Sequence, residues 1–218
     1  MKKTLLLFIL ILVPLLAAQA QFFRFGAKAG GGFARAAGDD ADADYINSLA
    51  VLHAGLLLTL QYSPKIAVQA EPQYSQKGVV YDNDPISPTE AMNGDLRFDY
   101  LEVPLLFKYQ KAALFVEAGP YLGYLVNVNS DVNLVNPDDP NPDDPVILGE
   151  QKFSRSDFQD LDYGYAIGGG IILDNGFFLG LRHTGGLRTF PKADLSQRNL
   201  NFLLSIGFLN PVRSPSNY

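Results

Sequence analysis

The feature that most constrains the fold is a two-residue alternation of apolar and polar side chains, which recurs along the chain in long runs. The clearest run is LRFDYLEVPLLFKY, residues 96–109. Side chains two residues apart point the same way in a β-strand, so each run predicts a strand with one apolar face and one more polar face. Eight such strands are predicted, over residues 22–35, 51–62, 66–77, 96–109, 113–126, 160–173, 177–188 and 198–209.

The connections between these strands alternate between short and long. The short ones are residues 63–65, 110–112 and 174–176, and the long ones are residues 36–50, 79–95, 129–157 and 189–197. Tight turns at one end of an antiparallel sheet and longer loops at the other are typical of outer-membrane barrels. The sequence therefore predicts an all-β fold: an eight-stranded antiparallel up-and-down transmembrane β-barrel with short periplasmic turns and long extracellular loops.

The N-terminal residues have the pattern of a secretory signal peptide. Lys2 and Lys3 precede an apolar run over residues 4–16, and the small-residue pattern AQA follows at residues 18–20. This pattern predicts Sec-type export, cleavage before Gln21 and a location in the cell outer membrane. The predicted organisation is a cleaved signal peptide over residues 1–20, a barrel over residues 21–210 and a short C-terminal tail over residues 211–218.

Acidic residues are concentrated in the long connections. With Asp157 counted as part of the strand that follows, these hold 15 of the 23 aspartates and glutamates but only three basic residues, Lys152, Arg155 and Lys192. The repeat NPDDPNPDDP, residues 136–145, contains prolines that lack a ladder donor and carboxylates that repel one another, so it is predicted to stand in water. The repeat is predicted to lie at the tip of the third extracellular loop and to give it an acidic surface of Asp138, Asp139, Asp143 and Asp144. The net charge of −6 makes nucleic acid an unsuitable partner.

Three phrases resemble the PorT-like outer-membrane β-barrel family. YLEVPLLFKY, residues 100–109, is similar to a mid-chain strand of that family, and EPQYSQKG, residues 71–78, and GPYLGYL, residues 119–125, resemble the phrases that flank it. The resemblance implies an eight-stranded outer-membrane barrel and no reaction, and the secretion role of the family's namesake is not transferred. Expected partners are outer-membrane lipid, the barrel-assembly machinery during biogenesis and an unidentified extracellular ligand.

Strand parity assigns the side chains to two faces of the barrel. A charged group facing lipid costs several kilocalories, so charged residues within strands are placed in the lumen. The predicted lumen polar network is Arg24, Lys28, Glu71, Glu102, Lys108, Glu117 and Arg182. The predicted lipid-facing band is Leu101, Val103, Leu105, Phe107, Leu179, Leu181, Phe202, Leu204, Ile206 and Phe208. Candidates for an interfacial aromatic girdle are Tyr62, Tyr109 and Tyr163.

The lumen carboxylates Glu71, Glu102 and Glu117 suit three interpretations: an ion-pair network, acid-base catalysis, or a narrow proton or ion path. Side chains fill the interior of an eight-stranded barrel, which favours the ion-pair network. The glycine run 168–170 lies inside a strand, so it indicates sharp curvature or room for a large lumen side chain and not a phosphate loop, and the run 30–32 in the first strand indicates curvature.

No catalytic motif stands out. The chain has no cysteine and two histidines, His53 and His183. A Ser75, His53 and Asp162 set is a weak candidate for nucleophilic catalysis. Asp-rich residues 40–44 come closest to a calcium loop but lack its glycine. The sequence therefore predicts no enzyme, no metal and no cofactor.

The predicted function is that of a non-enzymatic outer-membrane barrel, either envelope-structural or for surface recognition, which displays acidic loops. The alternatives are a narrow pore or a component of a secretion apparatus, a lipid-modifying barrel enzyme, and a periplasmic lipocalin-like binder of an apolar ligand. In the last of these the apolar face of every strand would lie inside. Alternation alone does not distinguish the inside of a barrel from its outside.

Overall fold

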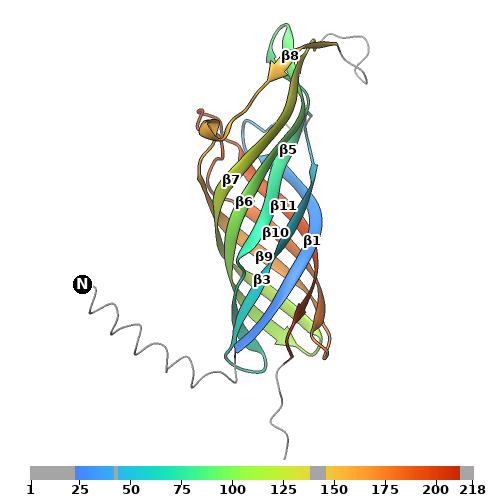
Figure 1. Cartoon of the computed structure of the whole chain (residues 1–218), viewed down its shortest axis with the longest axis vertical. Helices are drawn as coiled ribbons and strands as arrows, with labels where there is room; N and C mark the ends of the chain where they lie inside the picture. The colour runs from blue at the N-terminus through green and yellow to red at the C-terminus, as the bar shows by residue number, and fades with distance from the viewer. Residues whose placement is uncertain (1–22, 42–43, 138–145, 212–218) are drawn as a thin grey trace, which may run out of the picture.

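The structure is a computed structural model that describes residues 23–41, 44–137 and 146–211. It consists almost wholly of antiparallel β-strands (Figure 1). The strands are β1 (Phe23–Ala37), β2 (Ile46–Asn47), β3 (Leu49–Gln61), β4 (Ile66–Ala70), β5 (Gln73–Ser87), β6 (Glu90–Lys111), β7 (Leu114–Val135), β8 (Ile147–Gln151), β9 (Leu161–Ile172), β10 (Phe177–Gly186) and β11 (Arg198–Leu209), with one 3-10 helix at Arg155–Asp157. No helix in the described part of the chain is long and apolar enough to cross a membrane.

The strands close into a ring. β1 pairs with β3 on one side and with β11 on the other, where the register runs from Gly26 opposite Leu209 to Ala37 opposite Arg198. β4 and β5 occupy one position in the ring because both pair with β3 and with β6. The remaining order is β6, β7, β9, β10 and β11. The ring therefore has eight positions, the number expected from the sequence, and every pairing is antiparallel.

The strand predicted over residues 66–77 is interrupted in the structure. It breaks at Glu71 and Pro72, between β4 and β5. Proline has no N–H for the ladder, but the backbone carbonyl of Pro72 still accepts a hydrogen bond from the N–H of Leu56 at 3.0 Å. The Glu71 side chain stays on the inward face that parity assigns to it, where it is fully buried.

Two of the long connections predicted from the sequence, residues 79–95 and 129–157, prove to be largely strand. β5 continues to Ser87, β6 begins at Glu90 and β7 continues to Val135, where β8 pairs with it. With β2 these strands form a sheet in the order β2-β5-β6-β7-β8, which projects beyond the ring (Figure 1). This part of the chain, β5 to β8 beyond the ring, is called the extension below.

The extension was missed because its aspartates and Pro85 resemble loop residues. The two-residue alternation nevertheless continues into it, and Val79, Tyr81, Leu96 and Phe98 are all buried. Register shifts on either side of Pro85 accommodate the polar residues without ending the strands.

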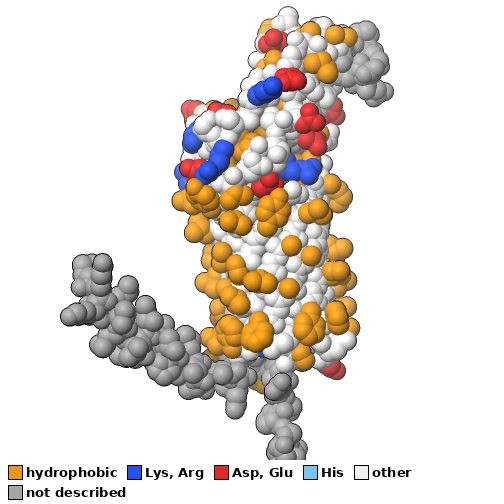
Figure 2. Space-filling model, viewed as in Figure 1, with side chains coloured by type: hydrophobic (Ala, Val, Ile, Leu, Met, Phe, Trp, Pro, Cys, Tyr) orange, Lys and Arg blue, Asp and Glu red, His pale blue; other side chains and the backbone are white. Residues whose placement is uncertain are grey.

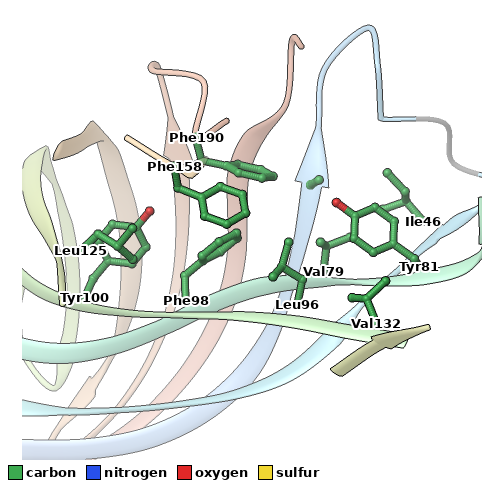
Figure 3. Packing of buried hydrophobic residues seen from close by; sticks show 11 residues of the cluster. Ile46, Val79, Tyr81, Leu96, Phe98, Tyr100, Leu125, Val132, Phe158 and Phe190 are labelled. Atoms are coloured by element: carbon green, nitrogen blue, oxygen red, sulfur yellow. The ribbon is translucent and has the colours of Figure 1, made fainter. Parts of the chain in front are cut away.

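Apolar side chains close the interior at both ends. Near the extension Phe98 packs against Phe158 and Phe190, with ring centroids 4.8 and 5.1 Å away, and Figure 3 shows the three rings in contact. Near the short turns a second cluster is formed by Leu57, Phe115, Ile172 and Leu209. Buried polar side chains such as Glu71, Glu117 and Arg182 lie between these two apolar layers.

Two inward-facing glycines show why their positions need the smallest residue. A Cβ at Gly30 would lie 1.9 Å from the carbonyl oxygen of Leu204 and 2.8 Å from Cε1 of His53, and one at Gly170 would lie 2.0 Å from the carbonyl oxygen of Leu179 and 2.9 Å from Cζ of Phe115. All four distances are shorter than a van der Waals contact allows. Gly170 therefore lets the neighbouring strand approach and makes room for a large interior side chain, which is one of the two interpretations made for its run. Gly30 does the same, although only curvature was predicted for its run.

Candidate functional site

The outer surface of the ring carries a continuous band of apolar side chains. All ten residues of the band predicted from the sequence lie on this surface, from Phe208 at 39% exposed to Leu181 at 66%. Figure 2 shows apolar side chains over the cylinder and charged ones gathered above it. Along β3 and the residue that follows it the band runs from Leu52 to Tyr62, and ten residue-to-residue steps at a rise of about 3.3 Å and a tilt of about 40° span roughly 25 Å. This height matches the apolar band of outer-membrane barrels.

A polar belt borders the band on the side of the extension. On β6 the last apolar residue is Leu101, and the next outward side chain is Asp99, which is only 7% exposed. Its carboxylate accepts hydrogen bonds from the Tyr74 hydroxyl at 2.6 Å and from the amides of Asn127 and Asn129, both at 3.1 Å. The sequence analysis did not identify this belt, although the cluster of amides over residues 127–129 was a signal for it.

Tyrosines lie at both edges of the band. Of the predicted girdle, Tyr62 and Tyr109 are exposed at the end with the short turns, and Tyr163 is exposed at the other end. Tyr124, which was not predicted, accepts a hydrogen bond from Arg155 at 2.7 Å, and this bond raises the pKa of Arg155. Arg155 also donates to Asp160 at 2.7 Å. The edge next to the extension therefore combines aromatic rings with charged groups.

A first buried cluster consists of five residues: Lys28, Glu71, Lys108, Glu117 and Arg182. Arg182 is at its centre, donating to Glu71 at 2.5 and 2.9 Å and to Glu117 at 3.0 Å. Lys28 donates to Glu71 at 2.6 Å. Arg182 is 8% exposed and the other four are 7% exposed or less. The guanidinium fork holds two carboxylates at once, which is the geometry that makes arginine strong in such pairs.

A second buried cluster consists of three residues: Lys77, Glu102 and Asp162. The ammonium of Lys77 lies 2.7 Å from Glu102 and 2.9 Å from Asp162, and the Lys77 side chain is fully buried. Tyr121 donates its hydroxyl to Asp162 at 3.2 Å, and the Lys77 ammonium lies 4.0 Å from the centroid of that ring. Lys77 and Asp162 were absent from the predicted network, although parity places Lys77 on the inward face of its strand.

The predicted lumen network is thus divided in the structure. Lys28, Glu71, Lys108, Glu117 and Arg182 meet in the first cluster, whereas Glu102 belongs to the second. Arg24 lies apart from both, where its guanidinium donates to the Asn210 carbonyl at 2.8 Å and to Gln61 at 3.2 Å.

The candidate catalytic residues do not assemble. His53 bonds to Ser205 through Nε2 at 2.8 Å, whereas Ser75 is opposite His53 in the ladder without such a bond. Asp162 is engaged by Lys77. His183 lies on the outer face, with its ring centroid 4.5 Å from that of Phe202. This arrangement offers no activated nucleophile among the residues considered.

The acidic candidates give no metal centre within residues 23–41, 44–137 and 146–211, where no group of three or more His, Cys, Asp or Glu is placed to hold an ion. Asp40 instead accepts a hydrogen bond from the backbone N–H of Ser196 at 2.6 Å. Asp42 and the loop aspartates Asp138, Asp139, Asp143 and Asp144 lie outside the described residues.

Comparisons with solved structures find similar folds at low sequence identity. The Yersinia pestis attachment invasion locus protein Ail is 12% identical with a TM-score of 0.46, and the match covers 86% of this chain and 98% of Ail. Neisserial surface protein A is 11% identical with a TM-score of 0.46, covering 85% and 96%. Pseudomonas aeruginosa OprG is 15% identical with a TM-score of 0.36, covering 85% and 96%. No curated protein sequence matches the chain.

A family model gives the decisive match. The model described as "Outer membrane protein beta-barrel domain" matches residues 17–190. This range covers most of the 218-residue chain and includes β1 to β10. The match supports an outer-membrane location. The closed antiparallel ring of eight positions agrees with it, and the chain belongs to the outer membrane protein β-barrel domain family.

Proposed function

We propose that this protein spans the outer membrane as a non-enzymatic barrel, in contact with lipid through its apolar band. The observation that carries the proposal is the distribution of side chains around the ring. Leucines, valines and phenylalanines face outward, whereas two clusters of ion pairs are buried inside. A lipocalin-like binder needs the reverse arrangement, with an apolar interior for its ligand. Lipid is the solvent in which the observed arrangement is stable.

The orientation follows from this proposal. The short turns would face the periplasm, and the extension would stand outside the cell, with Asp138, Asp139, Asp143 and Asp144 beyond it as an acidic surface. The proposal includes Sec-type export, cleavage before Gln21, a barrel over residues 21–210 and a short tail over residues 211–218. The resemblance of residues 100–109 to the PorT-like barrels supports the same placement, and assembly would require lipid and the barrel-assembly machinery.

The role proposed within the envelope is structural support or surface recognition. The extension supports it, because a sheet that projects past the apolar band offers a surface to the outside (Figure 2). The interior supports it too, because large buried side chains such as Phe98, Phe115 and Arg182 occupy the space inside the ring. An eight-stranded barrel whose interior is filled by side chains leaves no room for a channel, so its role is to anchor the extension in the membrane.

The test is expression of the chain with its signal sequence, followed by membrane fractionation and gel electrophoresis of heated and unheated samples. A closed membrane barrel is expected in the outer-membrane fraction, with a heat-dependent change in mobility. Recovery of the protein from the soluble periplasm would overturn the proposal. Co-purification with inner-membrane and periplasmic proteins would instead favour a component of a secretion apparatus.

The filled interior predicts that the barrel does not conduct ions. The purified protein in planar bilayers is expected to give no stable channel openings, because the ring of Phe98, Phe158 and Phe190 and the layer around Phe115 block the two ends of the lumen. A 16-stranded porin, which has a water-filled channel, is the positive control. Discrete openings from the wild-type protein would favour the narrow-pore alternative.

A further inference from the structure

We propose that the first buried cluster is a binding site for one small monovalent anion, a halide, held beside the ammonium of Lys108. Three features of the cluster point to an anion: the hydrogen bonding of Lys108, the local balance of charge and a small cavity in the wall of the cluster.

Lys108 is buried without a good partner. It is 4% exposed, and its nearest carboxylate oxygen, on Glu117, is 3.7 Å from Nζ, beyond hydrogen-bonding distance. The ammonium lies 3.8 Å from the centroid of the Phe115 ring. No described residue accepts a hydrogen bond from it, although a lysine ammonium has three donors. A buried charged donor without an acceptor is unfavourable, so the site favours an added acceptor.

The local charge favours an anion over water. Lys28, Lys108 and Arg182 carry three positive charges, whereas Glu71 and Glu117 carry two negative charges, so the cluster has one positive charge in excess. Arg182 and Lys28 already occupy the carboxylates at short range. Glu102 of the second cluster is six residues from Lys108 along β6, or about 20 Å, too far to neutralise it closely.

A cavity lies where the acceptor is needed. It has a volume of about 10 Å³ and is lined by the three cations Lys28, Lys108 and Arg182 and by the two carboxylates Glu71 and Glu117 that pair with them, with Gln69 and Ser205 as neutral polar neighbours and Phe115 and Phe178 as apolar ones. A space of that size holds about one water molecule. A halide ion is only slightly larger than water, whereas phosphate and organic anions are too large to enter without moving the ion pairs.

The first experiment is crystallography of the wild-type barrel grown in bromide, with anomalous data collected at the bromine edge. A peak in the cavity at about hydrogen-bonding distance from Lys108 Nζ is the expected result. Water in the cavity without an anomalous peak would overturn the proposal. This measurement needs no variant, so a folding defect in a mutant does not affect it.

The second experiment measures the midpoint of the heat-dependent mobility change in sodium bromide and in sodium gluconate at equal ionic strength. Wild type is expected to have a midpoint a few degrees higher in bromide, because a ligand of the folded state stabilises it. Lys108→Met is expected to lose this difference. Lys111→Met is the matched control, because Lys111 is an exposed lysine on the same strand. A bromide effect that persists in Lys108→Met, or is absent from wild type, would contradict the site.

Discussion

Replacing Val103 by arginine is expected to block accumulation of the barrel in the outer membrane. Val103 is 48% exposed and lies within the apolar band of β6, between Leu101 and Leu105. An arginine on the lipid face of a membrane barrel is unfavourable by about 2–4 kcal/mol at the midplane and by less toward the interfaces, and Val103 lies one outward position inside the edge of the band at Leu101, so a cost near the lower end of that range is expected. That amount is a large part of the stability of a small domain. The measurement is the amount of heat-modifiable protein in outer-membrane fractions.

Leu148→Arg is the matched control for Val103→Arg. Leu148 is 53% exposed, close to the exposure of Val103, but it lies on β8 in the extension, beyond the band. Both substitutions put the same cation on an exposed apolar position of a strand. A barrel in lipid should tolerate only Leu148→Arg. If Val103→Arg also reaches normal levels in the outer membrane, the prediction that the apolar band contacts lipid is wrong.

Replacing Lys77 by methionine is expected to reduce the free energy of unfolding by about 3–5 kcal/mol, the range for breaking a buried ion pair by removing one partner. Lys77 is the cation that contacts both Glu102 and Asp162, and all three are at most 3% exposed. The substitution would leave two buried carboxylates facing a thioether. Urea unfolding of the protein in lipid vesicles would measure the loss.

Two further variants separate this charge effect from a change of shape. The triple variant Lys77→Met, Glu102→Gln and Asp162→Asn removes all three charges together. It should therefore recover most of the free energy of unfolding that Lys77→Met loses. Lys152→Met makes the same substitution at an exposed pair with Glu150 and should leave the unfolding midpoint unchanged. If the triple variant is no more stable than Lys77→Met, then unpaired charge is not the cause.

The sequence by itself determined the face on which each strand residue lies. Alternation has a period of two, and this follows from strand geometry without reference to the rest of the chain. Parity put Glu71, Lys108 and Arg182 on one face and Val103 and Leu181 on the other, and the cost of a charge in lipid assigned the charged face to the inside, where the structure has it. That the outer face touches lipid stays a prediction. The count of alternating runs predicted the eight positions of the ring for the same local reason.

Other features were misjudged because the local signals conflicted. Aspartates and Pro85 made the extension look like loops, although Val79, Tyr81 and Leu96 kept the alternation that its strands require. Long-range pairing in the β5, β6 and β7 ladders outweighed the low strand propensity of those polar residues. The polar belt around Asp99 also depends on neighbours from β5 and β7 that propensity does not consider.

Only the tertiary structure decided which interior charges meet. Arg182 contacts Glu71, 111 residues earlier, and Lys77 contacts Asp162, 85 residues later. Parity says that these side chains face inward, but their height in the barrel depends on the register of every ladder and on the stagger with which the ring closes. Those quantities belong to all eight positions together, so the two clusters, the isolated Arg24 and the cavity beside Lys108 appear only once the ring is complete.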